Sequence, residues 1–343
     1  MKVEAGLSAT QISDISDQGR RAEALGIDRI TRSELNRDPF LPLAIAAEHT
    51  SHIELATSVA IAFPRSPTVV AHVARDLNDL SGGRFVLGLG TQVKGHIQRR
   101  FATEWSSPGP RFRDYIAAVR AVWDSWDSES SVEHDGEFYK LSLMTPEFSP
   151  GPSQFRRTPV QIAGVNRYNL RLAGDVCDGL RVHPFATRKY TEDVIWPAVQ
   201  EGAERSGRDL SGFEMIGGGF IASGASDEAV DGARERARYR LAFYASTRTY
   251  LPVLEAHGWE DLNATLRRLV SAGKWNELSA AVPDEVLDEF CVAGTYDAIL
   301  PKIQQRYEGL VDAISLDLPD EADSDQVGRL IEQIKELRTA NSR

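Results

Sequence analysis

The sequence predicts an α/β fold, a (β/α)₈ TIM barrel with insertions, and three observations support this prediction. Short apolar runs alternate with amphipathic helical stretches, which is the order of a parallel sheet with right-handed crossovers. The alternation yields eight strands, the number found in this barrel. Polar or glycine-containing loops follow several of these strands, and in such a barrel the loops after the strands share the face that carries the chemistry.

The strands are predicted from their apolar runs. The clearest is 84–89, because a Ser-Gly-Gly helix end precedes it and a polar loop follows it. Its nearly continuous apolar sequence is typical of a strand that is covered on both faces. The predicted strands are 3–7, 27–31, 53–57, 84–89, 159–163, 178–182, 213–222 and 312–316. A short additional strand is predicted at 137–141.

The helix boundaries follow from capping signals. The pairs Asp38-Pro39 and Ser66-Pro67 each place an N-cap residue before a proline at the first helical position. Gly26 and the Ser-Gly-Gly run at 81–83 mark helix ends. The predicted helices are 12–25, 38–50, 66–80, 111–126, 166–175, 188–206, 226–244, 259–272, 284–290, 296–308 and 325–338, with a basic helix start at 97–100.

Two segments are too long for a single crossover, about 128–158 and about 226–295. The first is irregular and rich in Ser, Pro and Gly. The second has helical spacing behind Ser226 as an N-cap, and Thr295 is the expected N-cap of the helix that follows it. We predict one domain over 1–343, with a helical elaboration between strands seven and eight. A separate small helical domain is the alternative.

Composition excludes several classes of protein. A formal net charge of −11 argues against a nucleic-acid partner, which needs a basic surface. Apolar runs stay well below the roughly 18 residues of a membrane span. The N-terminus predicts a strand rather than a signal peptide. Cys177 and Cys291 lie far apart and form no CxxC pair, so we expect a cytoplasmic protein without a disulfide framework.

Five separated segments place polar or glycine residues directly after predicted strands. Because the loops of a barrel converge on one face, we expect these residues to form one site. They are Glu34, Ser58, Val59, Gln92, His96, Gly164 and His183. The segment 163–166 also precedes a helix, so its free backbone N–H groups suit an anion such as phosphate, although a plain strand-to-helix turn explains it as well.

Other kinds of site find little support. The run Gly88-Leu89-Gly90 begins like a dinucleotide fingerprint, but the third glycine position is Val93 and the run follows strand four instead of strand one. His49 and His52 are better explained as residues at a helix end than as ligands, so no metal is expected. A GxSxG elbow is absent, which leaves a serine hydrolase without support.

Several longer strings carry a family resemblance. SGGRFVLGLGTQ, AEALGID, LAGDVCDGL and ATSVAIAF together resemble the bacterial luciferase-like superfamily of flavin and deazaflavin oxidoreductases. The strings DPFLPLAIAAEHT, AFPRSPTVVAHVARDL, GTQVKGHIQRRF and RVHPF resemble more narrowly the subgroup that depends on coenzyme F420. The match runs from Lys2 to the region of strand eight. These motifs carry no information about the substrate.

The resemblance implies a cofactor ring on the carboxyl-end face of the barrel. It implies a non-prolyl cis peptide at Ser58–Val59, which presses against the ring, with Gln92 and His96 beside it. The residues implied to hold the cofactor phosphate are Ala163, Gly164, Val165, Gly179 and Leu180. His183, at the end of strand six, joins the expected cofactor-binding set. The resemblance also implies a homodimer.

Departures from the family pattern limit the chemistry. An acid follows strand two as Glu34, but Leu35 stands where the sugar-phosphate dehydrogenases of the superfamily carry histidine, and Val93 replaces their glutamate. Their reaction is therefore not expected here. The available proton donors are His96, Glu34 and His183, and His96 is preferred because imidazole titrates near neutrality. His96 could equally orient the cofactor without moving a proton.

We therefore predict a coenzyme F420-dependent oxidoreductase that transfers hydride between the deazaflavin and a small organic substrate. Aromatic residues near the loops, Phe63, Phe101, Trp105 and Phe185, suggest a partly apolar substrate. An FMN-dependent monooxygenase on the same fold is the first alternative. A non-catalytic protein that binds a flavin or deazaflavin is the second.

Overall fold

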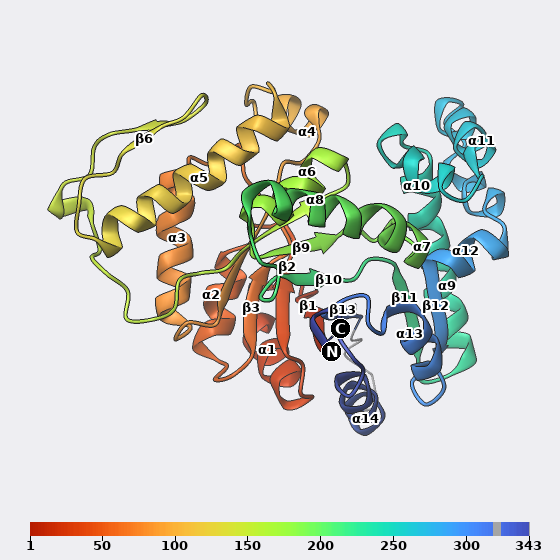
Figure 1. The fold of residues 1–343 in the computed structure, drawn as a ribbon. Helices are drawn as coiled ribbons and strands as arrows, with labels where there is room; N and C mark the ends of the chain where they lie inside the picture. The colour runs from red at the N-terminus through yellow and green to blue at the C-terminus, as the bar shows by residue number, and fades with distance from the viewer. Residues whose placement is uncertain (318–323, 343) are drawn as a thin grey trace.

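The computed structural model describes residues 1–317 and 324–342 and shows a closed barrel of eight parallel strands (Figure 1). These are β1 (Lys2–Gly6), β2 (Arg29–Arg32), β3 (Glu54–Thr57), β5 (Phe85–Gly90), β8 (Val160–Gly164), β9 (Gly179–Val182), β10 (Glu214–Ile216) and β13 (Ala313–Leu316). They follow the order β3-β2-β1-β13-β10-β9-β8-β5, and pairing of β5 with β3 closes the ring. The short β4 (Ala60–Ile61) extends the sheet beside the carboxyl end of β5. The predicted fold class is confirmed.

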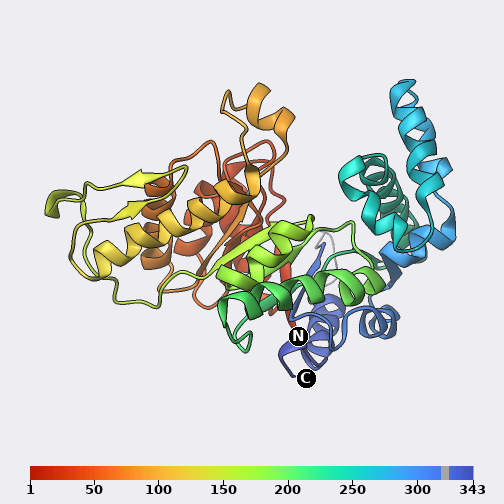
Figure 2. The ribbon, with the colours of Figure 1, turned by 45° about the horizontal axis from the view of Figure 1, so that its top comes forward.

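Helices between the strands cover the outside of the barrel (Figures 1 and 2). The longer ones are α1 (Ile15–Ala24), α2 (Leu41–Glu48), α3 (Pro67–Leu80), α5 (Pro108–Asp127), α6 (Arg167–Val176), α8 (Trp196–Ser206) and α14 (Ser324–Lys335). The shorter ones are η1 (Ile12–Asp14), α4 (Lys94–Arg99), α7 (Arg188–Tyr190) and the π-helix η3 (Thr191–Ile195). The predicted helix 188–206 is therefore divided into three parts.

Capping explains where two of these helices begin. Ser66 is the N-cap of α3, as predicted, and its hydroxyl accepts a hydrogen bond from the Val69 N–H at 3.2 Å. Helix α2 begins at Leu41, later than predicted. The Asp38 carboxylate still accepts from the N–H groups of Phe40 and Leu41, at 2.8 and 2.9 Å, so it satisfies donors at the helix start from outside the helix.

The predicted seventh strand, 213–222, is wrong as a single strand. It divides at three consecutive glycines, 217–219, into β10 and β11 (Phe220–Gly224). Only β10 belongs to the barrel, whereas β11 pairs in parallel with β12 (Cys291–Thr295), which the sequence did not predict. Thr295 is thus the last residue of a strand, and the helix expected at 296–308 is α13 (Leu300–Tyr307).

The two inserted segments lie on opposite flanks of the barrel (Figure 2). The first contains a small hairpin of β6 (His134–Asp135) and β7 (Lys140–Leu141), which covers part of the predicted strand 137–141, and a turn of helix, η2 (Pro146–Phe148). The second contains α9 (Asp227–Ala245), η4 (Arg248–Tyr250), α10 (Leu251–Glu255), α11 (Glu260–Ser271), η5 (Trp275–Glu277), η6 (Ser279–Ala281) and α12 (Asp284–Phe290). Ser226 caps α9 as predicted.

The helical segment contacts the loop that follows β9. The Thr187 hydroxyl lies 2.8 Å from His257 Nε2, and the Tyr250 hydroxyl lies 3.0 Å from His183 Nε2. Arg306 also donates a hydrogen bond to the Ala186 carbonyl at 2.7 Å. These contacts fix the segment beside one side of the barrel mouth. Among the helices that the structure describes, none is long and apolar enough to cross a membrane.

Candidate functional site

Small residues line the barrel mouth at the carboxyl ends of the strands. Side chains alternate along a strand, and Glu4 faces the barrel axis, so the strand register shows which other residues face inward. At this end of the barrel five of them are small, Gly6, Ser58, Gly90, Ala163 and Ser315, and the register also turns Thr31, Arg181 and Ile216 inward. Gly6 and Ser315 are exposed to solvent although they lie in central strands, and a Cβ on Gly6 would meet nothing within 4 Å. The mouth is therefore open between β1 and β13.

A buried ion cluster forms the floor of this mouth. The carboxylate of Glu4 pairs with Arg29 and, at 2.9 Å, with Nη1 of Arg181, and all three side chains are almost fully buried. Arg181 Nη1 also lies 3.4 Å from Ser58 Oγ. Burial alone would lower the pKa of Arg29, but the carboxylates of Glu4, Glu214 and Glu54 outweigh it and raise that pKa. The Arg29 guanidinium therefore stays charged beneath the mouth.

The peptide between Ser58 and Val59 is cis, as the family resemblance implies. Both residues are half-buried and connect β3 to β4 at the mouth. The Ser33 hydroxyl donates a hydrogen bond to the Ser58 carbonyl at 2.7 Å, and the Glu34 N–H donates to the Val59 carbonyl at 3.4 Å. The loop after β2 therefore supports this turn.

Glu34 makes structural contacts beside the mouth. Its Oε2 accepts a hydrogen bond from the Ile61 N–H at 2.7 Å and pairs with Arg65 Nη1 at 2.8 Å, and the side chain is buried. Glu34 therefore holds β4 in place, and its expected role as a proton donor stays a prediction.

Gln92 and His96 lie in the loop after β5, as predicted. Gln92 has a positive φ of 57°, and its side-chain oxygen accepts from the Val93 N–H at 2.9 Å. His96 lies on α4 and is exposed, and among residues 1–317 and 324–342 its imidazole has no hydrogen-bond partner. Arg100 at the end of α4 donates to the carbonyl of Leu35, so the loops after β5 and β2 meet here.

The four aromatic residues predicted near these loops divide into two kinds. Phe63 and Phe185 are core residues, with 4% and 1% of their surface exposed. Trp105 and Phe101 are half-buried, and the Trp105 ring packs edge-on against Phe63 with the centroids 6.0 Å apart. Phe101 and Trp105 therefore remain the apolar side chains that a ligand could reach from this set.

The turn from β8 into α6 forms a polar cradle. Gly164 is buried, and a Cβ there would lie 3.1 Å from Asn169 Cβ. The Asn166 side chain caps α6 by accepting from the Asn169 N–H at 2.9 Å, while the N–H groups of the first two helical residues have no partner within the helix. Asn169 Oδ1, which the sequence analysis missed, is buried without a partner among the described residues. Ala163, Gly164 and Val165 thus fit the expected anion site.

Gly179 and Leu180 do not join this cradle. They are the first two residues of β9 and are buried within the barrel wall. Gly179 pairs in register with Gln161 and Glu214, which lie at the amino ends of their strands. A Cβ on Gly179 would lie 2.5 Å from the Glu214 carbonyl oxygen, so this glycine permits close strand packing. Their expected role in phosphate binding stays a prediction.

His183 lies at the rim of the mouth, two residues beyond the inward-facing Arg181. Its Nδ1 accepts a hydrogen bond from the Phe185 N–H at 3.0 Å. Burial, and then the charge of Arg240, lowers the pKa of His183 to about 4. His183 is therefore neutral near pH 7, and its expected role as a proton donor stays a prediction.

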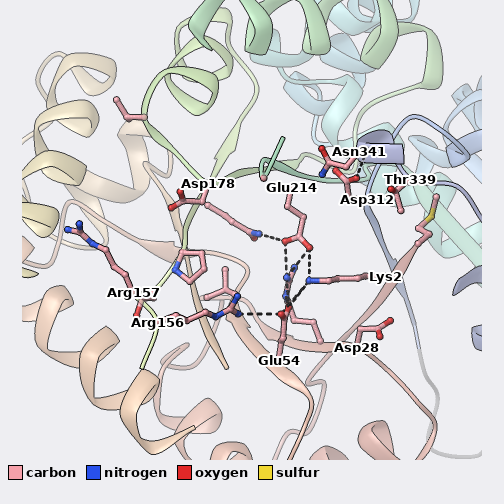
Figure 3. A pocket seen from close by; sticks show the side chains of 18 of the residues that line it. Lys2, Asp28, Glu54, Arg156, Arg157, Asp178, Glu214, Asp312, Thr339 and Asn341 are labelled. Atoms are coloured by element: carbon pink, nitrogen blue, oxygen red, sulfur yellow. Dashed lines mark hydrogen bonds and ion pairs between the residues drawn. The ribbon is translucent and has the colours of Figure 1, made fainter. Parts of the chain in front are cut away.

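The opposite mouth, at the amino ends of the strands, holds a cavity of about 1020 Å³ (Figure 3). Lys2 pairs there with Glu54 and Glu214 at 3.2 and 3.1 Å, and Arg156 lies 3.5 Å from Glu54. Burial would raise the pKa of Glu214, but Arg29 and Lys2 lower it to about 2. The sequence analysis missed this cluster. Residues at this face of a (β/α)₈ barrel typically contribute to stability, whereas the catalytic residues lie at the other mouth.

The closed barrel and its open mouth at the carboxyl ends of the strands define a (β/α)₈-barrel enzyme. The family model described as luciferase-like monooxygenase matches residues 1–313. The chain belongs to this family of oxidoreductases.

Relatives of known sequence agree with this assignment. An uncharacterized protein of Mycobacterium tuberculosis is 41% identical over 309 residues, which cover 90% of this chain and 91% of that protein. The 5,10-methylenetetrahydromethanopterin reductase of Archaeoglobus fulgidus is 29% identical over 291 residues, which cover 83% of each.

Solved structures share the fold. The coenzyme F420-dependent tetrahydromethanopterin reductase of Methanopyrus kandleri superposes with a TM-score of 0.76 at 20% identity, covering 100% of this chain and 99% of that one. The oxygenating constituent of 3,6-diketocamphane monooxygenase from Pseudomonas putida, solved with FMN, has a TM-score of 0.65 at 16% identity, covering 99% and 98%. Proteins that share this fold thus include an F420-dependent enzyme and one solved with FMN.

Proposed function

We propose that this protein is a coenzyme F420-dependent oxidoreductase that transfers hydride between the deazaflavin and a small, partly apolar organic substrate. The observation that carries the proposal is the similarity, over 83% of the chain, to a methylenetetrahydromethanopterin reductase, together with the fold shared with an F420-dependent reductase. The open mouth lined by small residues offers room for a flat ring system.

Different residues of the mouth would bind different parts of the cofactor. The N–H groups at the start of α6, beside Ala163, Gly164 and Val165, would hold the cofactor phosphate. Ser58 and Val59 would lie against one side of the ring, and Gln92 would lie beside it. The deazaflavin supplies the hydride chemistry when bound.

His96 is our preferred proton donor among the three expected from the sequence. Its exposed imidazole has no partner among the described residues, whereas Glu34 is paired with Arg65 and His183 accepts a backbone hydrogen bond.

The FMN-dependent monooxygenase is the second candidate, because a fold neighbour is solved with FMN and both cofactors carry a phosphate. A non-catalytic flavin or deazaflavin carrier is the third candidate function. The homodimer and the cytoplasmic location stay predictions; the two cysteines are free and buried, which suits a reducing compartment.

Fluorescence titration of the purified protein with coenzyme F420, and separately with FMN, tests the proposal. We expect micromolar binding of the deazaflavin and much weaker binding of FMN. Tight binding of FMN alone would replace the proposal with the monooxygenase. Binding of the deazaflavin without hydride transfer to any of a panel of enones, ketones and alcohols would favour the carrier.

A further inference from the structure

Tyr250 stands over the rim of the barrel mouth, although it belongs to the helical segment between β10 and β13. It ends the short helix η4 and is half-buried. Its ring stacks on the His183 imidazole with centroids 4.6 Å apart and an interplanar angle of 29°. His183 directly follows the carboxyl end of β9, so it lies at the rim of the mouth. Tyr250 is thus placed beside the mouth.

The hydrogen bonds of His183 fix its tautomer. A backbone N–H can only donate, so the Phe185 N–H, 3.0 Å from Nδ1, requires Nδ1 to be an unprotonated acceptor. A neutral imidazole then carries its single proton on Nε2. That nitrogen lies 3.0 Å from the Tyr250 hydroxyl oxygen, so His183 is the donor and Tyr250 the acceptor in this hydrogen bond.

The proton of the Tyr250 hydroxyl is consequently left for another acceptor. Among the residues that the structure describes, none accepts it. Burial, with a further contribution from Tyr244, raises the pKa of Tyr250 to about 12. The hydroxyl therefore stays protonated over the whole physiological range. A phenol whose oxygen is held by one partner and whose proton is unused is a directed hydrogen-bond donor.

We propose that Tyr250 donates a hydrogen bond to an oxygen of the substrate, and that His183 is a positioning residue which aims this donor. The proposal rests on the proposed function in that it names the substrate class: a neutral carbonyl compound, or the alcohol derived from it.

The surroundings of Tyr250 favour such a substrate. An uncharged phenol suits a neutral carbonyl oxygen, whereas a carboxylate or phosphate is better held by a guanidinium or ammonium group. The rings of Tyr244 and Phe185 lie 5.5 Å from that of Tyr250, so the wall around the hydroxyl is aromatic. On this aromatic wall the Tyr250 hydroxyl, with its unused proton, orients a small organic molecule by its polar end.

The test uses a chromophoric carbonyl probe, p-dimethylaminocinnamaldehyde, whose absorption band moves to longer wavelength when its carbonyl oxygen accepts a hydrogen bond. We expect the full-length protein to bind the probe with a red shift. Tyr250→Phe should lose the shift and weaken binding about tenfold, the loss typical of one such hydrogen bond. Tyr244→Phe, which removes a neighbouring phenol, is the matched control and should keep the shift.

Two further variants separate positioning from structure. His183→Gln retains an N–H donor near Nε2 and should keep part of the shift, whereas His183→Leu should lose most of it while the protein stays folded by circular dichroism. The absence of a shift in the wild-type protein, or its survival in Tyr250→Phe, would overturn the proposal. The probe needs no cofactor, so a failed F420 titration together with a Tyr250-dependent shift would reject only the proposed cofactor.

Discussion

At the scale of single residues, the mouth of the barrel depends on side chains whose partners lie far away in sequence. Glu34 and Arg65 are separated by 31 positions, yet together they hold the β4 backbone through the Ile61 N–H. The sequence predicted that Glu34 would reach this face, because it follows a strand. Its role could not be predicted, since nothing local shows that Arg65 would neutralise it.

Replacement of Glu34 tests this structural role. Glu34→Gln keeps an acceptor for the Ile61 N–H but removes the charge that pairs with Arg65. We expect the free energy of unfolding to fall by about 1–3 kcal/mol, the range for a hydrogen bond to a charged group. Urea denaturation measures it, with Glu48→Gln on exposed α2 surface as the control. An unchanged midpoint would mean that the Glu34 contacts contribute nothing.

His183 gives stability a defined pH dependence. The unfolded chain takes up a proton at this residue below pH 6.5, whereas the folded protein does so only near its pKa of about 4. Stability is therefore complete above pH 6.5 and is lost as the pH falls toward 4, by about 3 kcal/mol from this group.

The comparison of wild type with His183→Gln isolates this effect, because all other groups titrate in both proteins. We expect the unfolding free energy of the wild type to fall relative to that of His183→Gln as the pH is lowered from 7 to 4. Parallel stability curves over this range would show that His183 does not stay neutral.

At the scale of elements, the glycines after β10 decide where the barrel strand stops. The run from 213 to 222 is apolar except for Glu214 and three consecutive glycines, and these glycines are the sequence signal of a break that the prediction of one strand did not use. A side chain cannot be accommodated at Gly218, where a Cβ would lie 2.4 Å from the His183 carbonyl oxygen and 2.7 Å from Val182 Cγ1. The close approach of the β9 loop and the pairing of β11 with the distant β12 are tertiary contacts. The periodicity of the sequence does not predict them.

Gly218→Ala is therefore expected to press on the loop that carries His183. Overpacking against a backbone carbonyl costs about 1–3 kcal/mol. The measurement is the urea midpoint, with an unchanged slope if the fold persists. Gly212→Ala serves as the control, because a Cβ there meets nothing within 4 Å. Equal midpoints for the two variants would contradict the close packing of this turn.

At the scale of the whole molecule, eight strands and their order were readable because strand and helix signals alternate so regularly. The charged residues inside those strands were not explained by the same signals. Glu4, Arg29 and Arg181 come from β1, β2 and β9, and they pair only because the barrel closes. A charged residue within an apolar strand indicates a buried partner, but the sequence does not identify that partner.

Removal of the shared carboxylate should affect the whole barrel. Glu4→Gln leaves Arg181 without its carboxylate and removes one from Arg29, and breaking a buried ion pair costs about 3–5 kcal/mol. We expect a large fall in the urea midpoint. Asp135→Asn, which breaks an exposed ion pair with Lys140, should leave the midpoint unchanged. A Glu4→Gln variant as stable as its parent would show that the cluster is not needed for closure.

The chain leaves the barrel after β10 and returns at β13, and these strands are neighbours: the Gly217 N–H donates to the Ala313 carbonyl at 2.8 Å, and the Asp312 N–H to the Met215 carbonyl at 2.8 Å. The two ends of the segment between these strands are therefore adjacent in the barrel wall, and the segment also contacts the loop after β9. A different segment can therefore be inserted between β10 and β13 without displacing a barrel strand. The turn from β8 into α6 would stay unchanged, whereas the wall that carries Tyr250 would be replaced together with the segment.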